Sequence, residues 1–228
     1  METGLKIYLL ELGATVVGFA RVDEALQGDI AHLRRAVSIG VDRKLNEDTV
    51  SLLSALQSRA AARLKSDGYR YLIIPPDSDR ISDTCISKLY ELFSHKVAAT
   101  SSGLGWIGKN GLLISEQYGP GLTFTTVLTD APLVPDEPVN SSRCGNCTLC
   151  VVHCPAQAIK GVNWSRSEPL RPLVDHDRCR AQKVGTRRVE HKPNCGLCIN
   201  ICPYGRKSPY RGNISNNDLE EHRCPSIK

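Results

Sequence analysis

Two closely spaced runs of cysteine constrain this chain more than any other feature. The first run has the pattern C-x2-C-x2-C-x3-C-P and the second the pattern C-x2-C-x3-C-P. Three cysteines at two-residue spacing let one loop surround a [4Fe–4S] cubane, whereas the cysteine before the proline serves the neighbouring cluster. This rule predicts one cluster held by Cys144, Cys147, Cys150 and Cys202, and a second held by Cys154, Cys179, Cys195 and Cys198.

Zinc is the alternative occupant of such cysteines. Paired C-x2-C knuckles commonly bind zinc, but they rarely carry a third cysteine at the same spacing followed by Cys-Pro. Charge divides at the same place in the chain, because residues 141–228 hold 15 Lys and Arg against 7 Asp and Glu, whereas residues 1–140 hold 14 against 17. Two cubanes ligated by thiolates carry about four negative charges in total, so they offset about half of that positive excess.

The remaining composition predicts a cytoplasmic protein. The 228 residues contain no apolar run of about 18, the length that a membrane span requires. The first residues, METGLKIYLLELGA, include three charges where a signal peptide would be apolar, so they predict a short amphipathic helix. In a reducing compartment, clustered cysteines indicate metal ligands instead of disulfides. Outside the two runs, Cys85 reads as a small buried hydrophobe more readily than a reactive thiol, and Cys224 has no assigned role.

The first 140 residues have the pattern of a mixed α+β domain. Apolar residues recur at helical spacing between Glu47 and Asp67, and a second helix is predicted over 86–99. Strands are predicted over 14–20, 36–41, 69–74, 111–115 and 122–130. We therefore expect an α+β domain over residues 1–138 and a ferredoxin-like double-cluster domain over residues 139–228.

The stretch SSGLGWIGKNG contains the triplet G-x-G-x-x-G, which is also found in dinucleotide-binding turns. That fingerprint requires a preceding strand, a following helix and an acidic residue about 20 positions later. Here the triplet follows a predicted helix and precedes a predicted strand, and position 123 is Thr123. The sequence therefore excludes a dinucleotide-binding fingerprint.

Several motifs together resemble the epoxyqueuosine reductase family. They are SSGLGWIGKNGLLI, VLTDAPL, CGNCTLCVVHCP and CGLCINICP, and the segment FSHKVAA is similar to short paralogues from anaerobic microbes. The resemblance covers about Phe93 to Tyr204. It implies a nitroreductase-like α+β domain that carries a base-off cobalamin beside a two-cluster ferredoxin module, as in reductive dehalogenases. By this analogy the glycines would let backbone approach the corrin, with the pocket formed by Gly103, Gly105, Trp106, Gly108, Lys109 and Asn110.

The implied activity is an iron–sulfur oxidoreductase that passes low-potential electrons through two clusters to a bound cobalamin and its substrate. The alternatives are an electron-transfer partner that lacks its own corrinoid and reduces another protein's, and a protein that uses its metal for stability alone.

Two departures from the family argue against epoxyqueuosine in tRNA as the substrate. The family's catalytic aspartate precedes the glycine stretch, where the nearest aspartate in this chain is Asp83, and the family's helical-repeat tail has no counterpart after the second cysteine run. Tyr90, Glu91 or His95 could supply a proton instead, although each is also an ordinary helix residue.

A basic stretch between the cysteine runs gives an indication of the binding partners. It consists of Arg178, Arg180, Lys183, Arg187, Arg188 and Lys192. It either offsets the cluster charge or forms a docking face for an acidic electron donor such as a ferredoxin or flavodoxin. The stretch has no interleaved aromatic residues, which argues against RNA and leaves a small molecule or a corrinoid protein as the expected substrate. The substrate itself and the oligomeric state are left open.

Overall fold

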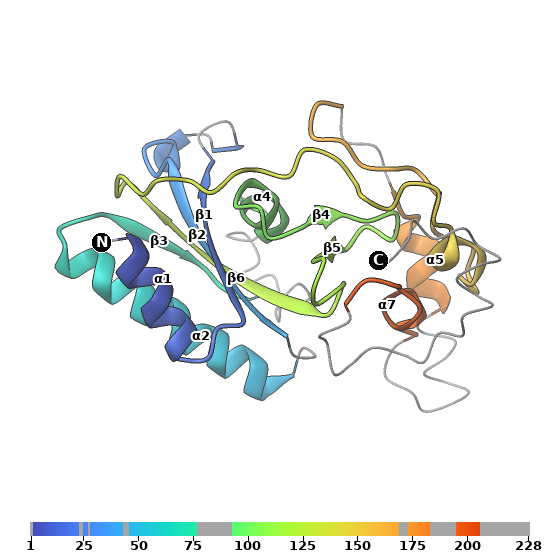
Figure 1. Cartoon of the computed structure of the whole chain (residues 1–228), viewed down its shortest axis with the longest axis horizontal. Helices are drawn as coiled ribbons and strands as arrows, with labels where there is room; N and C mark the ends of the chain where they lie inside the picture. Colours follow the sequence, from blue (N-terminus) through green and yellow to red (C-terminus); the bar gives the residue numbers. More distant parts are fainter. Residues whose placement is uncertain are drawn as a thin grey trace. The chain divides into compact units, whose positions relative to one another are not determined.

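The computed structural model describes residues 2–22, 25–26, 28–42, 46–76, 93–168, 173–182 and 195–205. These residues form two compact units (Figure 1). The first unit contains residues up to Gly105 together with Leu122–Val139, and the second contains Trp106–Gly121 and the residues from Asn140 onward. The sequence predicted a single boundary at 138/139. The structure differs for residues 106–121, which belong with the cysteine-rich unit because they hydrogen-bond to its loops.

The first unit is built on a four-stranded antiparallel sheet in the order β1-β2-β6-β3 (Figure 1). The strands are β1 (Val16–Arg21), β2 (Arg35–Asp42), β3 (Tyr71–Ile74) and β6 (Leu122–Thr129). Each lies within or beside a predicted strand, and the mixed helix and sheet content agrees with the expected fold class. The pairing is antiparallel throughout this sheet, so β6, the last strand in sequence, lies between β2 and β3.

Helices α1 (Glu2–Glu11) and α2 (Glu47–Ser66) cover one face of this sheet. Helix α2 begins where the side chain of Asn46 accepts a hydrogen bond from the amide of Thr49 at 2.8 Å, which satisfies a donor left free at the helix start. Its apolar face meets the sheet in a core that includes Leu9, Ile39, Leu53, Leu56, Leu64 and Val127. No helix among the described residues is both long enough and apolar enough to cross a bilayer.

Helix α4 (His95–Ser101) packs on the opposite face, together with Phe93 and Leu128. The sequence predicted a helix over 86–99, but this helix begins only at His95. Ser94 is extended and its hydroxyl accepts a hydrogen bond from the amide of Lys96, so Ser94 is the N-cap. The earlier part of the prediction, up to residue 92, lies outside the described residues.

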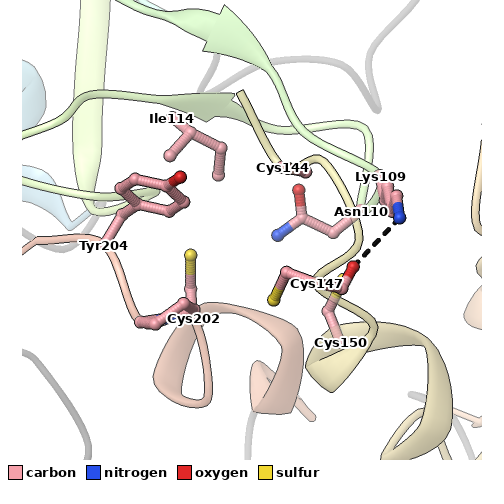
Figure 2. Close-up of a pocket in the computed structure, with 9 residues that line it drawn as sticks. Lys109, Asn110, Ile114, Cys144, Cys147, Cys150, Cys202 and Tyr204 are labelled. Atoms are coloured by element: carbon pink, nitrogen blue, oxygen red, sulfur yellow. Dashed lines mark hydrogen bonds between the residues drawn. The ribbon is translucent and has the colours of Figure 1, made fainter. Parts of the chain in front are cut away.

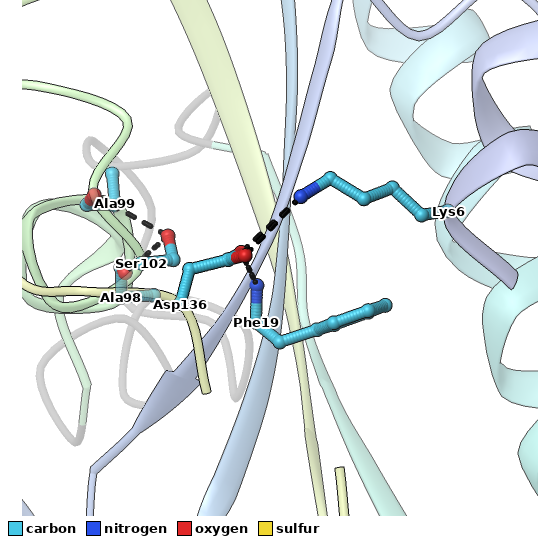
Figure 3. A network of polar contacts seen from close by, with 6 residues as sticks. All are labelled: Lys6, Phe19, Ala98, Ala99, Ser102 and Asp136. Atoms are coloured by element: carbon cyan, nitrogen blue, oxygen red, sulfur yellow. Dashed lines mark hydrogen bonds and ion pairs between the residues drawn. The ribbon is translucent and has the colours of Figure 1, made fainter. Parts of the chain in front are cut away.

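Strand β1 is an edge of the sheet, and the segment that carries Asp136 lines it (Figure 3). The amide of Phe19 donates to Asp136 Oδ2 at 2.8 Å, and the amide of Asp136 donates to the carbonyl of Phe19 at 2.9 Å. The ammonium of Lys6 lies 3.3 Å from Asp136 Oδ1, with side-chain exposures of 38% and 36%. Asp136 therefore occupies edge hydrogen-bonding groups that another strand could otherwise use.

Asp136→Ala should lower the free energy of unfolding by about 1–3 kcal/mol, because the Phe19 amide loses its acceptor. Lys6→Met should cost less than about 1 kcal/mol, because the half-exposed ion pair is screened by solvent. Urea titrations of both variants measure the difference. Equal losses would mean that the ion pair, and not the backbone hydrogen bond, fixes the segment.

The second unit has little regular structure. Its described residues contain a hairpin of β4 (Trp106–Ile107) and β5 (Leu113–Ile114), two four-residue helices, α5 (Leu149–Val152) and α7 (Leu197–Asn200), and a helical stretch at 176–182. Isolated bridges join Ser141 to Ser165 and Ile159 to Val174.

Candidate metal centre

Each of the two cysteine runs includes one short helix of the second unit, α5 in the first run and α7 in the second. Cys150 lies in α5, with Cys144 and Cys147 before it and Cys154 after it. Cys198 lies in α7 between Cys195 and Cys202, and Cys179 lies in the helical turn at 176–182. All eight are free thiols.

One group of thiols lines a small cavity that is partly open to solvent (Figure 2). Its cysteines are Cys144, Cys147, Cys150 and Cys202, and its other lining residues are Lys109, Asn110, Ile114, Pro203 and Tyr204. Burial raises the pKa of Cys150 to about 12, and the neighbouring charges of Cys144 and Cys147 add to the effect. The pKa of Cys202 is raised for the same main reason, with Cys144, Cys150 and Cys147 as its cysteine neighbours.

The other four thiols form a second group around Cys198. Burial raises the pKa of Cys198 to about 11, and the charges of Cys179, Cys195 and Cys154 raise it further. Cys154, Cys179 and Cys198 also pack against the apolar cluster of Ala158, Ile159 and Val174. The two groups contain the same cysteines as the two sets that the Cys-Pro rule predicts, and the assignment of these ligands to clusters stays a prediction.

The shape of the first group distinguishes a cluster from a single ion. Zinc draws four thiolates to about 2.3 Å from one centre. Four thiols that surround a cavity instead fit a polynuclear cluster, with one thiolate for each iron.

The tip of the β4–β5 hairpin holds both cysteine runs. The ammonium of Lys109, only 5% exposed, donates to the carbonyls of Gly145 at 2.8 Å and Cys147 at 3.0 Å (Figure 2). The amide nitrogen of Asn110 donates to the carbonyl of Cys198 at 3.1 Å. The sequence assigned both residues to a corrin pocket, whereas the structure gives them contacts to the cysteine loops. No spacing signal connects the hairpin to the cysteines, so these roles were missed.

The glycines of this stretch have packing roles in the structure. Gly103, with φ +71°, follows the C-cap of α4, and the amide of Leu104 donates to the carbonyl of Ala99, the arrangement that ends many helices. A Cβ at Gly103 would lie 2.6 Å from the carbonyl oxygen of Glu137, and one at Gly108 would lie 2.7 Å from Ile114. Gly105 is buried. A Cβ at Gly103 or Gly108 would thus collide with neighbouring atoms, and the corrin pocket assigned to this stretch stays a prediction.

Trp106 is buried at 1% exposure between two partners of the second unit. Its ring meets that of Tyr204 edge-on at 4.8 Å, and the guanidinium of Arg143 lies 5.5 Å from its centroid. Among the described residues its indole N–H has no hydrogen-bond partner. Tyr204, two residues after Cys202, donates its hydroxyl proton to the carbonyl of Arg143 at 2.8 Å, so Trp106 supports the cysteine cavity.

His95 is a core residue in this structure. It is 5% exposed, its Nε2 donates to the carbonyl of Pro75 at 2.8 Å, and its Nδ1 shares a hydrogen bond with the hydroxyl of Thr126 at 2.8 Å. These contacts favour the structural reading of His95 over a proton donor. The other proposed proton donors, Tyr90 and Glu91, and the cysteines Cys85 and Cys224 lie outside the described residues.

The basic stretch is described only at its start. Arg178 and Arg180 follow Asp175 in the sequence. The carboxylate of Asp175 accepts a hydrogen bond from the amide of Arg178. This hydrogen bond is the main cause of the lowered pKa of Asp175. The guanidinium of Arg178 is also 3.5 Å from Asp175. Lys183, Arg187, Arg188 and Lys192 lie outside the described residues.

Known proteins bear on both units. The family described as 4Fe-4S double cluster binding domain matches residues 143–205. An epoxyqueuosine reductase from Synechocystis is 35% identical, with 55% of this chain and 47% of the relative covered, and one from Synechococcus is 38% identical, with 49% and 34% covered. The chain thus spans about half or less of the length of these relatives.

The fold is shared with solved structures of two kinds. A crystal structure of epoxyqueuosine reductase with an epoxyqueuosine-modified tRNA-Tyr stem loop has a TM-score of 0.63 at 18% identity, covering 96% of this chain and 74% of that one. A reductive dehalogenase in complex with 3-bromo-4-hydroxybenzoic acid has a TM-score of 0.65 at 19% identity, covering 96% and 33%. At such identities the likeness establishes the fold alone.

The sequence-based expectation that nucleic acid is not a partner is wrong. The named relatives are epoxyqueuosine reductases, and a protein of the same fold is solved with a tRNA stem loop. The expectation relied on the lack of aromatic residues in one basic stretch. Folded RNA is also recognised through its shape and its phosphates, which need no stacking platform.

The motifs, the double-cluster domain and the fold thus agree, and the chain resembles the epoxyqueuosine reductase-like family.

Proposed function

We propose that this protein is an iron–sulfur reductase that delivers electrons through two [4Fe–4S] clusters to an epoxide-containing nucleoside in RNA. The observation that carries the proposal is the grouping of eight free thiols into two sets of four inside a double-cluster domain. When bound, the clusters supply one-electron transfer at low potential. Reduction of an epoxide requires two electrons and two protons, so two one-electron centres match the demand.

The ligands would be divided by the Cys-Pro crossover. Cys144, Cys147, Cys150 and Cys202 would hold one cluster, and Cys154, Cys179, Cys195 and Cys198 the other. The raised pKa values of Cys150 and Cys198 mean that metal must displace protons from these thiols at neutral pH. Lys109 and Asn110 would keep the loops in place through the carbonyls of Gly145, Cys147 and Cys198. Clustered free thiols that serve as metal ligands are typical of a reducing compartment, which is consistent with the cytoplasm.

RNA as the substrate rests on the relatives' names and on the shared fold with a tRNA-bound reductase. The positive excess of residues 141–228 exceeds what two clusters offset, and this leaves basic charge for phosphates.

A corrinoid as the immediate electron acceptor is a further part of the proposal. Its support is the fold shared with a reductive dehalogenase for which a B12-dependent mechanism is suggested. The residues first expected to line the corrin are used in packing and in holding the cysteine loops. This observation favours a second candidate function, in which the chain reduces a corrinoid held by another protein.

One set of measurements on the anaerobically reconstituted full chain tests these functions. We expect about eight irons and eight acid-labile sulfides per chain and an absorption band that bleaches with dithionite. Stoichiometric zinc without sulfide would overturn the cluster assignment. With added cobalamin and an epoxyqueuosine-containing RNA stem loop, mass spectrometry should detect reduction of the nucleoside. Loaded clusters with no RNA turnover and no cobalamin in equilibrium dialysis would favour the electron-relay function.

A further inference from the structure

Lys109 differs from the other lysines that surround the cysteine loops. It is 5% exposed, and among the described residues it pairs with no Asp or Glu. Its hydrogen bonds go to two carbonyls, those of Gly145 and Cys147. A buried ammonium is costly unless an opposite charge or oriented dipoles compensate it. Two carbonyl dipoles supply part of this compensation.

The rest of the compensation is available in the cavity that Lys109 lines. Cys144, Cys147, Cys150 and Cys202 line the same cavity, so four thiolates with their irons would bring net negative charge next to the ammonium. Reduction adds one more negative charge to such a group. A fixed positive charge in a low-dielectric site favours the reduced state, because screening by water is weak there.

At the second cysteine loop, the residue that plays the part of Lys109 is neutral. Asn110, the next residue, donates to the carbonyl of Cys198 but carries no charge. Arg178 and Arg180, the basic residues that flank Cys179, are both exposed, and the guanidinium of Arg178 lies beside Asp175. Exposed and paired charges act weakly on a buried centre. The hairpin tip therefore holds one loop with a buried charge and the other with a neutral amide.

We propose that Lys109 is a positioning residue that raises the reduction potential of the cluster at Cys144, Cys147, Cys150 and Cys202 above that of its neighbour. An electron donated by an external one-electron reductant to either cluster would then reside mainly on this one. The inference rests on the cluster ligands named under the proposed function, and it goes beyond them by assigning the order of the two potentials and the residue that sets it.

The test is a redox titration of the reconstituted full chain with dithionite, followed by electron paramagnetic resonance. Lys109→Met should lower the ratio of reduced to oxidised first cluster about tenfold at the wild-type midpoint, a shift of about 59 mV for one electron. The second cluster should change less than about threefold. Lys109→Arg, which keeps the charge, should stay within about threefold of wild type at both clusters. Lys160→Met, the same change at an exposed lysine of this unit, is the control.

The wild-type order of potentials gives an independent test in case Lys109→Met does not fold or does not retain iron. Cys144→Ala with Cys202→Ala should leave only the second cluster, and its potential should be the lower of the two found in wild type. Equal potentials in wild type, or equal shifts of both clusters in Lys109→Met, would overturn the inference while leaving the two-cluster function intact. Absence of clusters from wild type would instead overturn the proposed function.

Discussion

Removing Cys144 and Cys202 together should leave about four of the eight irons in one intact cluster, whereas removing Cys144 and Cys154 together should leave no intact cluster. The two cysteines of the first pair come from different runs but line the same cavity. Cys154 instead lies with Cys179 and Cys195 around Cys198, whose pKa their charges raise. If ligands cross between the runs, the first double variant damages one cluster and the second damages both.

Double variants are more decisive than single ones here, because the iron that remains shows whether the two removed ligands belong to one cluster or to two. Iron and sulfide analysis after identical anaerobic reconstitution measures the outcome, and Cys85→Ala is a control outside the two sets. If the pair Cys144 and Cys202 damaged both clusters and the pair Cys144 and Cys154 left half of the iron, each run would hold its own cluster and the crossed assignment would be wrong.

Trp106→Ala should destabilise the second unit by about 3–5 kcal/mol, the range for truncating a buried aromatic ring. The ring is 1% exposed and lies against Tyr204 and Arg143. Because Tyr204 lies two residues after Cys202, the change should also speed the loss of iron to a chelator. In a chain of this size the expected fall in melting temperature is about 6–20 °C.

Trp106→Phe separates packing from hydrogen bonding. The indole N–H has no partner among the described residues, so phenylalanine should retain most of the stability. Trp164→Ala is the matched control, because that ring is only partly buried and contacts the guanidinium of Arg166 at 5.8 Å. Melting curves and iron release are followed for all three variants. A loss in Trp106→Phe as large as in Trp106→Ala would mean that the N–H serves a bound group, and the scaffold role of Trp106 would fail.

These variants also separate the roles of the hairpin. Trp106 supports the cavity by packing, and Lys109 and Asn110 hold its loops by hydrogen bonds. If the hairpin belongs functionally to the cluster unit, changes within it should alter iron retention or potential before they alter the sheet of the first unit.

The sequence by itself determined the features that depend on residues close together in the chain. The spacing of the cysteines and the prolines after Cys154 and Cys202 indicated two clusters and their ligands, because a short loop fixes which thiolates can reach one cubane. Alternating and helical apolar patterns predicted the strands of the sheet and helix α2, because side-chain direction repeats with local backbone geometry. The same local reasoning excluded a dinucleotide-binding turn.

Only the tertiary structure decided what depends on residues far apart in the chain. The contact from Lys109 to Gly145 spans 36 positions, that from Asn110 to Cys198 spans 88, and that from Phe19 to Asp136 spans 117. Strand β6 likewise pairs with β2 and β3, which lie far from it in the sequence. Such contacts are selected by the packing of the whole unit, and no periodicity or spacing in the sequence encodes them. The glycine stretch therefore looked like a ligand-binding turn in isolation, whereas in the folded chain it ends a helix and begins the hairpin that holds the cysteine loops.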